Sequence, residues 1–77
     1  MVVAGVLIRT APGKTKSAIE ELRKLEGMIS VQAVFGRFDV VAMIEAKDLD
    51  EAANTVVSKI RQIDGVTYTE TLIAAKI

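Results

Sequence analysis

The stretch "ISVQAVFGRFDVVAMIEA", residues 29–46, decides the fold of this chain. Two runs rich in β-forming residues, ISVQAVFG and RFDVVAMIEA, meet at Gly36, where the missing Cβ permits the backbone angles that a tight connection needs. The pattern predicts a β-hairpin. Its corner also carries Arg37, Phe38 and Asp39, although a turn does not require a phenylalanine.

A strand and a helix are predicted before the hairpin. Val2–Arg9 is rich in β-branched residues and is followed by a Pro-Gly turn, which is typical of a strand and its end. Residues 14–25 predict a helix that stops before Gly27, because apolar side chains recur there at helical spacing. These apolar positions are Ala18, Ile19, Leu22 and Leu25.

A second helix and a last strand are predicted after the hairpin. Residues 47–65 begin with an acidic variant of the capping box, formed by Asp48 and Glu51, and end at Gly65. Residues 66–77 alternate threonines with larger side chains and predict a strand. The apolar positions that share one face of the helix are Leu49, Ala52, Ala53, Val56, Val57, Ile60 and Ile63.

The resulting order, βαββαβ, predicts an α+β ferredoxin-like fold. Right-handed crossovers place both helices on one face of an antiparallel four-stranded sheet. Both faces of the sheet are apolar, because Ile8 lies opposite Leu7 in the first strand and Val40 lies opposite Val41 in the third. The face that the helices leave uncovered is therefore apolar as well. We therefore expect this face to pack against a second copy, giving a dimeric α+β barrel. A monomer with a short sheet is the alternative.

Composition excludes several classes of function. A chain of 77 residues forms one domain, residues 1–77, and a domain of this size buries only about 60% of the surface that its unfolded chain exposes, so a partner would help to stabilise it. The chain has no cysteine and no histidine, so we expect no metal, no cofactor and no catalytic base of the usual kind. Ten basic residues balance ten acidic ones, which disfavours nucleic-acid binding.

The N-terminal segment MVVAGVLIRT has no basic region or small-residue cleavage site and is too short to span a bilayer. We expect a soluble protein of the cytoplasm that does not enter a membrane.

A row of threonines in the last strand suggests a small-molecule site. Thr67, Thr69 and Thr71 place three hydroxyls on one side of a strand that is otherwise built for burial. Together with the polar corner they could bind a small ligand. The alternative is that Asp39 stabilises the turn and the threonines are ordinary strand residues.

Two clusters could suggest catalysis or metal binding. Tyr68 and Glu70 share a strand face and could act as an acid/base pair, which keeps a small cofactor-free enzyme as an alternative. The cap of one helix contains three carboxylates, those of Asp48, Asp50 and Glu51. Because the helix dipole stabilises anions at this end of a helix, we expect no metal site there.

At these positions the chain resembles the C-terminal effector-binding domain of the Lrp/AsnC family of leucine-responsive and feast/famine regulators, also called the RAM domain. Three segments carry the resemblance: VLIRTAPG, SVQAVFGRFDVVAMIEAKDLDEAANTVVSKI and IDGVTYTETLIAAK. The most diagnostic parts are the Gly-x-Tyr-Asp corner, here GRFD, and the Gly-Val before a Thr-x-Thr strand, here DGVTYTET.

The resemblance implies a site for a free amino acid in a cleft between subunits. The amides around Gly36 and Arg37 would bind the α-carboxylate, and Asp39 would contact the ammonium group or position the loop. Phe38 replaces the usual tyrosine, which keeps an apolar wall but removes a hydroxyl. Hydroxyls would come from the threonine row, namely Thr67, Thr69 and Thr71.

The resemblance also implies assembly. Members of this family form dimers and higher rings such as octamers, and their regulators carry an N-terminal helix-turn-helix domain. Because this sequence starts at its first strand, we expect a stand-alone, non-catalytic effector domain that does not bind DNA itself and that co-assembles with full-length regulators. The alternatives are a cofactor-free enzyme on the same dimeric barrel and an ACT-like amino-acid-binding domain.

Overall fold

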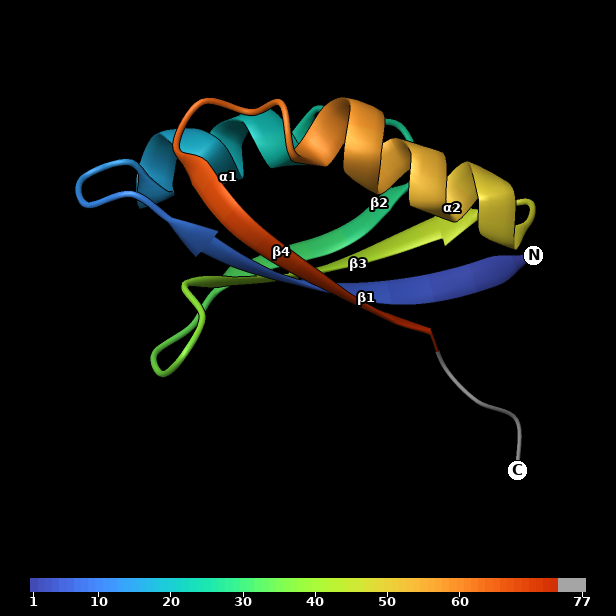
Figure 1. Ribbon diagram of the computed structural model, residues 1–77, viewed down its shortest axis with the longest axis horizontal. Helices are drawn as coiled ribbons and strands as arrows, with labels where there is room; N and C mark the ends of the chain where they lie inside the picture. The colour runs from blue at the N-terminus through green and yellow to red at the C-terminus, as the bar shows by residue number, and fades with distance from the viewer. Residues whose placement is uncertain (74–77) are drawn as a thin grey trace.

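The computed structural model describes residues 1–73 and shows the predicted order of strands and helices (Figure 1). The elements are β1 (Val2–Thr10), α1 (Thr15–Arg23), β2 (Met28–Ala33), β3 (Val40–Ala46), α2 (Leu49–Thr55), the π-helix η1 (Val56–Ile60) and β4 (Val66–Ile73). The end of the predicted last strand, residues 74–77, lies outside the described residues.

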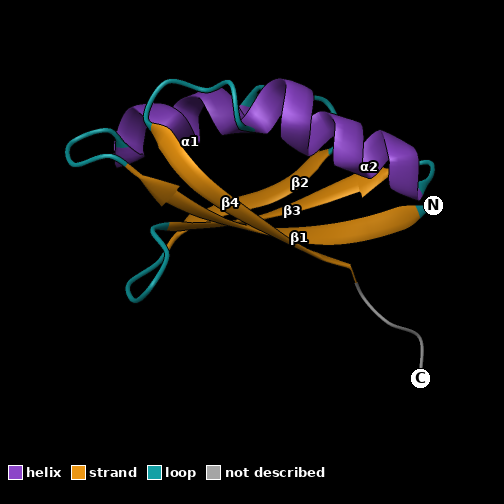
Figure 2. Cartoon of the chain, viewed as in Figure 1, coloured by secondary structure: helices purple, strands orange, loops and turns teal. Residues whose placement is uncertain are grey.

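The sheet is antiparallel and four-stranded, in the order β2-β3-β1-β4. Both helices lie on one side of it, and the strands cross beneath them with a strong twist (Figure 2). The other side of the sheet carries no element of this chain among residues 1–73. The predicted α+β ferredoxin-like fold, with two helices on one face of an antiparallel four-stranded sheet, is therefore confirmed, and the sheet of this one chain is open.

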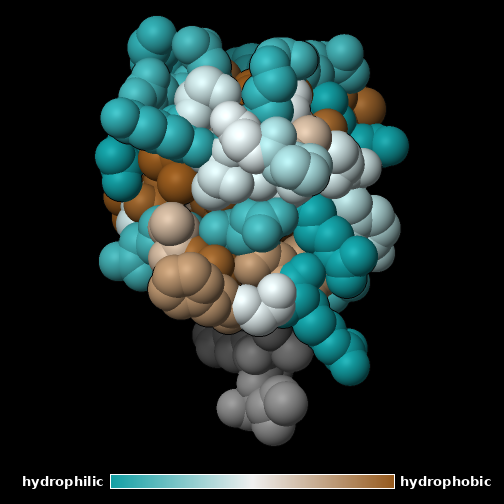
Figure 3. Space-filling model, turned by 90° about the vertical axis from the view of Figure 1, so that its left-hand side faces the viewer, coloured by the Kyte–Doolittle hydropathy of each residue, from teal (hydrophilic) through white to brown (hydrophobic). Residues whose placement is uncertain are grey.

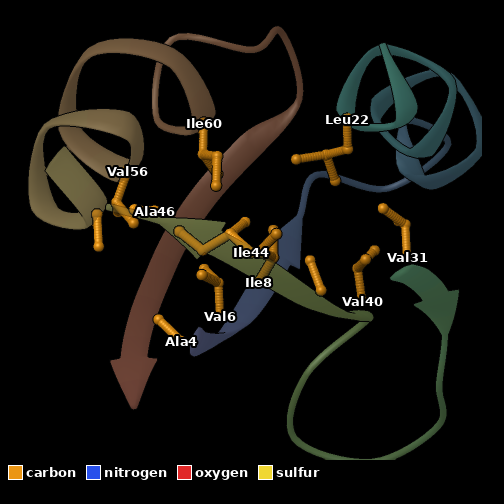
Figure 4. Packing of buried hydrophobic residues seen from close by; sticks show 12 residues of the cluster. Ala4, Val6, Ile8, Leu22, Val31, Val40, Ile44, Ala46, Val56 and Ile60 are labelled. Atoms are coloured by element: carbon orange, nitrogen blue, oxygen red, sulfur yellow. The ribbon is translucent and has the colours of Figure 1, made fainter. Parts of the chain in front are cut away.

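The core lies between the helices and one face of the sheet (Figure 4). Alternate residues of the two central strands point into it, as the period of two along a strand requires. From the helical side, Leu22 of α1 and Val56 and Ile60 of η1 pack onto them. The buried strand residues are Ala4, Val6, Ile8, Val31, Val40, Ala42, Ile44 and Ala46.

The connection between β2 and β3 is longer than predicted. The sequence indicated two strands meeting in a tight corner at Gly36, whereas residues 34–39 form a loop outside both strands. The backbone N–H of Val34 donates to the carbonyl of Asp39 (3.0 Å) and closes this loop. Gly36 has a φ of +132°, a conformation that glycine adopts without strain. The hairpin exists, but its connection is a loop rather than a tight turn.

The second helix begins as predicted but changes its winding. Asp48 is the N-cap, and its side chain accepts a hydrogen bond from the backbone N–H of Glu51 (2.8 Å), which confirms half of the capping box. The Glu51 carboxylate accepts from the N–H of Lys47, one residue earlier than the standard box would have it (3.1 Å). From Val56 the chain continues as a π-helix, in which the N–H of Arg61 donates to the carbonyl of Val56 (2.9 Å).

The face away from the helices is largely apolar in its central strands. Leu7, Val41 and Met43 are half-buried there by their neighbours alone, and Val3 and Leu72 are exposed. In the end view of Figure 3 hydrophilic surface dominates the top of the molecule, and apolar surface gathers at the left and lower left, beside a hydrophilic strip at the lower right. We call these five residues, Val3, Leu7, Val41, Met43 and Leu72, the uncovered face.

Within residues 1–73, no helix has both the length and the apolar character that are needed to cross a membrane.

Candidate functional site

The loop of residues 34–39 lies at the end of the sheet where β1 finishes and β4 starts. Gly36 and Arg37 are exposed, and a Cβ placed on Gly36 would meet no atom within 4 Å. Their backbone amides are therefore open to a ligand or to another subunit.

Asp39 is bound to the neighbouring strand. Its carboxylate oxygen Oδ2 accepts a hydrogen bond from the backbone N–H of Thr10 (2.8 Å), and its own N–H donates to the carbonyl of Ile8 (2.9 Å). These contacts support a structural role for Asp39 in holding the loop. A carboxylate has about four acceptor positions, so its second oxygen can still bind a donor.

Phe38 belongs to an aromatic cluster on the other side of the sheet from Ile8. Its ring stacks on Tyr68 of β4, with ring centroids 6.2 Å apart and an interplanar angle of 25°. The Arg9 guanidinium carbon lies 5.3 Å from the Phe38 ring centroid and 5.6 Å from that of Tyr68. Cation–π attraction of this kind stabilises the loop. We call Arg9, Phe38 and Tyr68 the aromatic cluster.

Sequence reasoning missed Arg9 and gave Tyr68 a different role. The two residues are cross-strand partners in the β1–β4 register, which the sequence does not reveal. Tyr68 and Glu70 do share a face of β4, since their partners Arg9 and Leu7 alternate with the buried Ile8. The Tyr68 ring, however, is stacked on Phe38 and lies beside the Arg9 guanidinium.

The threonines lie on the helix side of β4. Thr69 pairs with Ile8 and Thr71 with Val6, and both partners point into the core. The Thr67 hydroxyl donates to the carbonyl of Arg9 (3.2 Å). Phe38 and the threonine row are therefore on opposite sides of the sheet, and one chain alone does not join them into a single pocket.

A groove runs between the second helix and β4, and it includes two of the predicted threonines. Its volume is about 480 Å³, and its walls are formed mainly by apolar side chains. The lining residues are Leu49, Ala53, Val56, Val57, Arg61, Thr69, Thr71 and Ile73. A smaller polar hollow of about 300 Å³ adjoins it and is lined by Arg61, Val66, Thr67, Tyr68 and Thr69. Arg61 and Thr69 belong to both and so lie at their junction.

The chemistry offered by these residues is binding chemistry. Hydroxyls, backbone amides and a guanidinium group can fix a polar ligand, and the apolar walls can take its side chain. Among residues 1–73, no group of three or more carboxylates is placed to hold a metal ion.

Similar proteins are found for nearly the whole length of this chain. Residues 3–77 match the family model described as the Lrp/AsnC ligand binding domain. An HTH-type transcriptional regulator of Pyrococcus horikoshii, PH0140, is 32% identical over 76 residues, which are 99% of this chain and 48% of the regulator. The chain thus spans about half the length of the curated relatives it matches.

Solved structures show the same fold. TTHA0845 from Thermus thermophilus has a TM-score of 0.93 and 34% identity, and the match covers 100% of this chain and 96% of that one. The transcriptional regulator NMB0573 from Neisseria meningitidis, solved as a complex with L-Met, has a TM-score of 0.86 and shares the fold at 16% identity, over 97% of this chain and 50% of its own. Because the family model matches residues 3–77, nearly the whole chain, this chain belongs to the Lrp/AsnC family, as a ligand-binding domain of that family.

Proposed function

We propose that this chain is an amino-acid-sensing oligomerisation module that binds a free amino acid at a subunit interface and modulates transcription in the cytoplasm through co-assembly. The observation that carries the proposal is the match of residues 3–77 to the Lrp/AsnC ligand binding domain. Its curated relatives are regulators of transcription, which supports a regulatory rather than an enzymatic role.

The uncovered face supports assembly. Val3 and Leu72 are 39% and 50% exposed, and Leu7, Val41 and Met43 extend the apolar surface along the same face of β1 and β3. Contiguous apolar surface of this kind marks an interaction site on a soluble domain. A second copy offers the same surface and closes a dimeric α+β barrel, and such dimers are the units of higher rings such as octamers.

The separation of the candidate residues supports an interface site. Gly36, Arg37, Phe38 and Asp39 lie in the loop at one end of the sheet, whereas Thr69 and Thr71 lie on its helix side. Within one subunit the loop and the threonine row are separated. At an interface, the loop of one subunit can lie next to the threonine row of another. In that cleft the loop amides bind the α-carboxylate, the threonine hydroxyls bind polar atoms of the ligand, and Phe38 contacts its side chain.

The partners proposed are further copies of this chain and full-length Lrp/AsnC regulators, and not DNA. The chain carries balanced charge, which supplies no general attraction to phosphates. The match to TTHA0845 covers 96% of that chain, so chains of nearly this length are found with this fold.

A thermal-shift screen of the twenty amino acids, combined with sedimentation, tests the proposal. Free amino acids come first because a regulator of the same fold was solved with L-Met. A ligand present at a hundredfold excess over its Kd stabilises the native state by about 2.7 kcal/mol, which gives a clear rise in Tm. We expect one or a few amino acids to raise Tm and the protein to sediment as a dimer or larger. A stable monomer with no response to any amino acid would refute the proposal.

A further inference from the structure

We propose that the groove between the second helix and β4 is itself a binding site, within one chain, for a small aliphatic monocarboxylate whose anionic group is held by Arg61. The inference goes beyond the proposed function, because this groove is formed without a subunit interface and without residues 34–39.

Four of the five residues that line the groove from the helical side are spaced four positions apart. They are Leu49, Ala53, Val57 and Arg61. In an α-helix each such step turns about 40° past one full turn, so a long row with this spacing drifts away from a straight groove. The first three residues make the wall apolar, and Leu49 and Val57 are 55% and 53% exposed. The fourth adds a positive charge at its end.

The π-helix brings Arg61 back into line with this row. Between Val56 and Ile60 the helix is wound more widely, with the N–H of Arg61 bonded to the carbonyl of Val56, five residues earlier. A wider turn needs more residues and so opposes the drift of the row. As a result Arg61 lines the same groove as Leu49, twelve positions earlier, instead of turning away from β4. π-turns are frequent at functional sites.

The strand side supplies complementary polar groups. Thr69 stands with Arg61 at the junction of the apolar groove and the polar hollow, and Thr71 lies farther along the groove. A guanidinium group binds a carboxylate with two parallel hydrogen bonds, and a hydroxyl can donate a third. The aliphatic part of the ligand then lies between Val57 and Ile73. A volume of about 480 Å³ is within the usual range of small-molecule pockets.

The charges of the lining residues select against a zwitterion. Within residues 1–73, neither the groove nor the adjoining hollow is lined by an aspartate or a glutamate. An ammonium group bound there would face the positive charge of Arg61 with no carboxylate to balance it. The groove therefore favours a 2-oxo acid or a simple carboxylic acid with a short branched chain over the amino acid of the same skeleton.

Isothermal titration of the whole chain with three compounds of matched skeleton tests this assignment. The compounds are 4-methyl-2-oxopentanoate, leucine and the neutral 4-methylpentanamide. We expect the oxo acid to bind at least tenfold more tightly than either of the others, and its affinity to fall as salt is added, because the contact is an ion pair.

Three variants locate the binding. Arg61→Gln should weaken binding of the oxo acid at least tenfold, while Lys59→Gln, which removes a charge two residues earlier and outside the groove lining, should leave its Kd unchanged. Ala53→Leu should fill the apolar end and also weaken binding. Both Ala53 and Arg61 are exposed, so we expect the Tm values of the unliganded variants to stay close to that of the parent.

Several outcomes would overturn the assignment. These are equal affinity for leucine and the oxo acid, undiminished binding by Arg61→Gln, no binding of any carboxylate, or a change of oligomeric state in Ala53→Leu, which would show that a second copy covers the groove. The two proposals fail separately. If amino acids raise Tm in the screen while carboxylates do not bind, the groove assignment is wrong and the proposed function stands.

Discussion

The carboxylate of Asp39 accepts a hydrogen bond of 2.8 Å from the backbone N–H of Thr10, which ties the loop before β3 to the end of β1. A hydrogen bond to a charged group contributes about 1.5 to 3 kcal/mol, and partial exposure places this one near the lower end. Asp39→Ala should therefore lower the free energy of unfolding, measured in urea, by about 1 to 2 kcal/mol without any ligand.

Asp64→Ala provides the matched control. Asp64 pairs with Lys14 at 3.1 Å, but its side chain is 88% exposed, so its loss should cost less than about 0.5 kcal/mol. The comparison separates the two roles considered for Asp39. An Asp39→Ala protein as stable as the parent that no longer responds to amino acids would assign Asp39 to the ligand instead of the loop.

The aromatic cluster should determine how rigid that loop is. Phe38→Leu keeps an apolar side chain but removes the stack on Tyr68 and the contact with Arg9. Such contacts contribute about 1 kcal/mol, so hydrogen exchange at the Val34 amide, which closes the loop, should become about fivefold faster. Phe35→Leu is the control, because Phe35 is fully exposed and should leave the exchange rate unchanged. Equal rates in both variants would show that the cluster does not hold the loop.

The order of strands and helices was predicted well, because the side-chain pattern of each element depends only on residues that are close in sequence. Alternation in the first strand placed Val6 and Ile8 on one side and Leu7 on the other, and the structure confirms this. The capping pair at the start of the second helix is equally local, and Asp48 is its N-cap. The prediction that all apolar residues of that helix lie on one buried face was only partly correct. Ala52, Val56 and Ile60 are buried, while Leu49 and Val57 are exposed along the groove.

Features that depend on contacts distant in sequence were not predictable. The loop before β3 extends to Asp39 because that residue binds Ile8 and Thr10, and nothing within the hairpin indicates this. Likewise, the threonine row could be recognised as a row, but its side of the sheet follows from the pairing of Thr69 with Ile8. The position of Arg61 in the groove was not predicted. It depends on the π-helix Val56–Ile60 just before it, and a π-helix of five residues leaves no periodic pattern in the sequence.

Two glycines with positive φ should respond differently to alanine. Gly27 has a φ of +86°, and a Cβ there would lie 2.7 Å from the carbonyl oxygen of Glu45, so Gly27→Ala must shift the backbone of β3. We expect a loss of more than about 2 kcal/mol in the free energy of unfolding. Gly36→Ala meets open space and should cost about 1 kcal/mol for its backbone conformation alone. Urea denaturation of both variants checks the order, and the reverse order would contradict this account.

The last prediction concerns the uncovered face and the dimer proposed to form there. Val41 lies near the middle of this face, paired with Leu7 on one side and Gln32 on the other. In a monomer a lysine at position 41 can extend into water, so Val41→Lys should fold normally, with an unchanged circular dichroism spectrum. In a dimer the same charge is buried without a partner, which costs several kcal/mol. Sedimentation should therefore show the dimer Kd rising at least a hundredfold, to give a monomer at micromolar concentration. Gln62→Lys adds the same charge at an exposed position just after the second helix, on the helix side of the sheet, and should change the Kd by less than about threefold, because that charge keeps its water in the dimer as well. If both variants remain dimers, the subunits associate through another surface, and the dimeric barrel is the wrong arrangement for this chain.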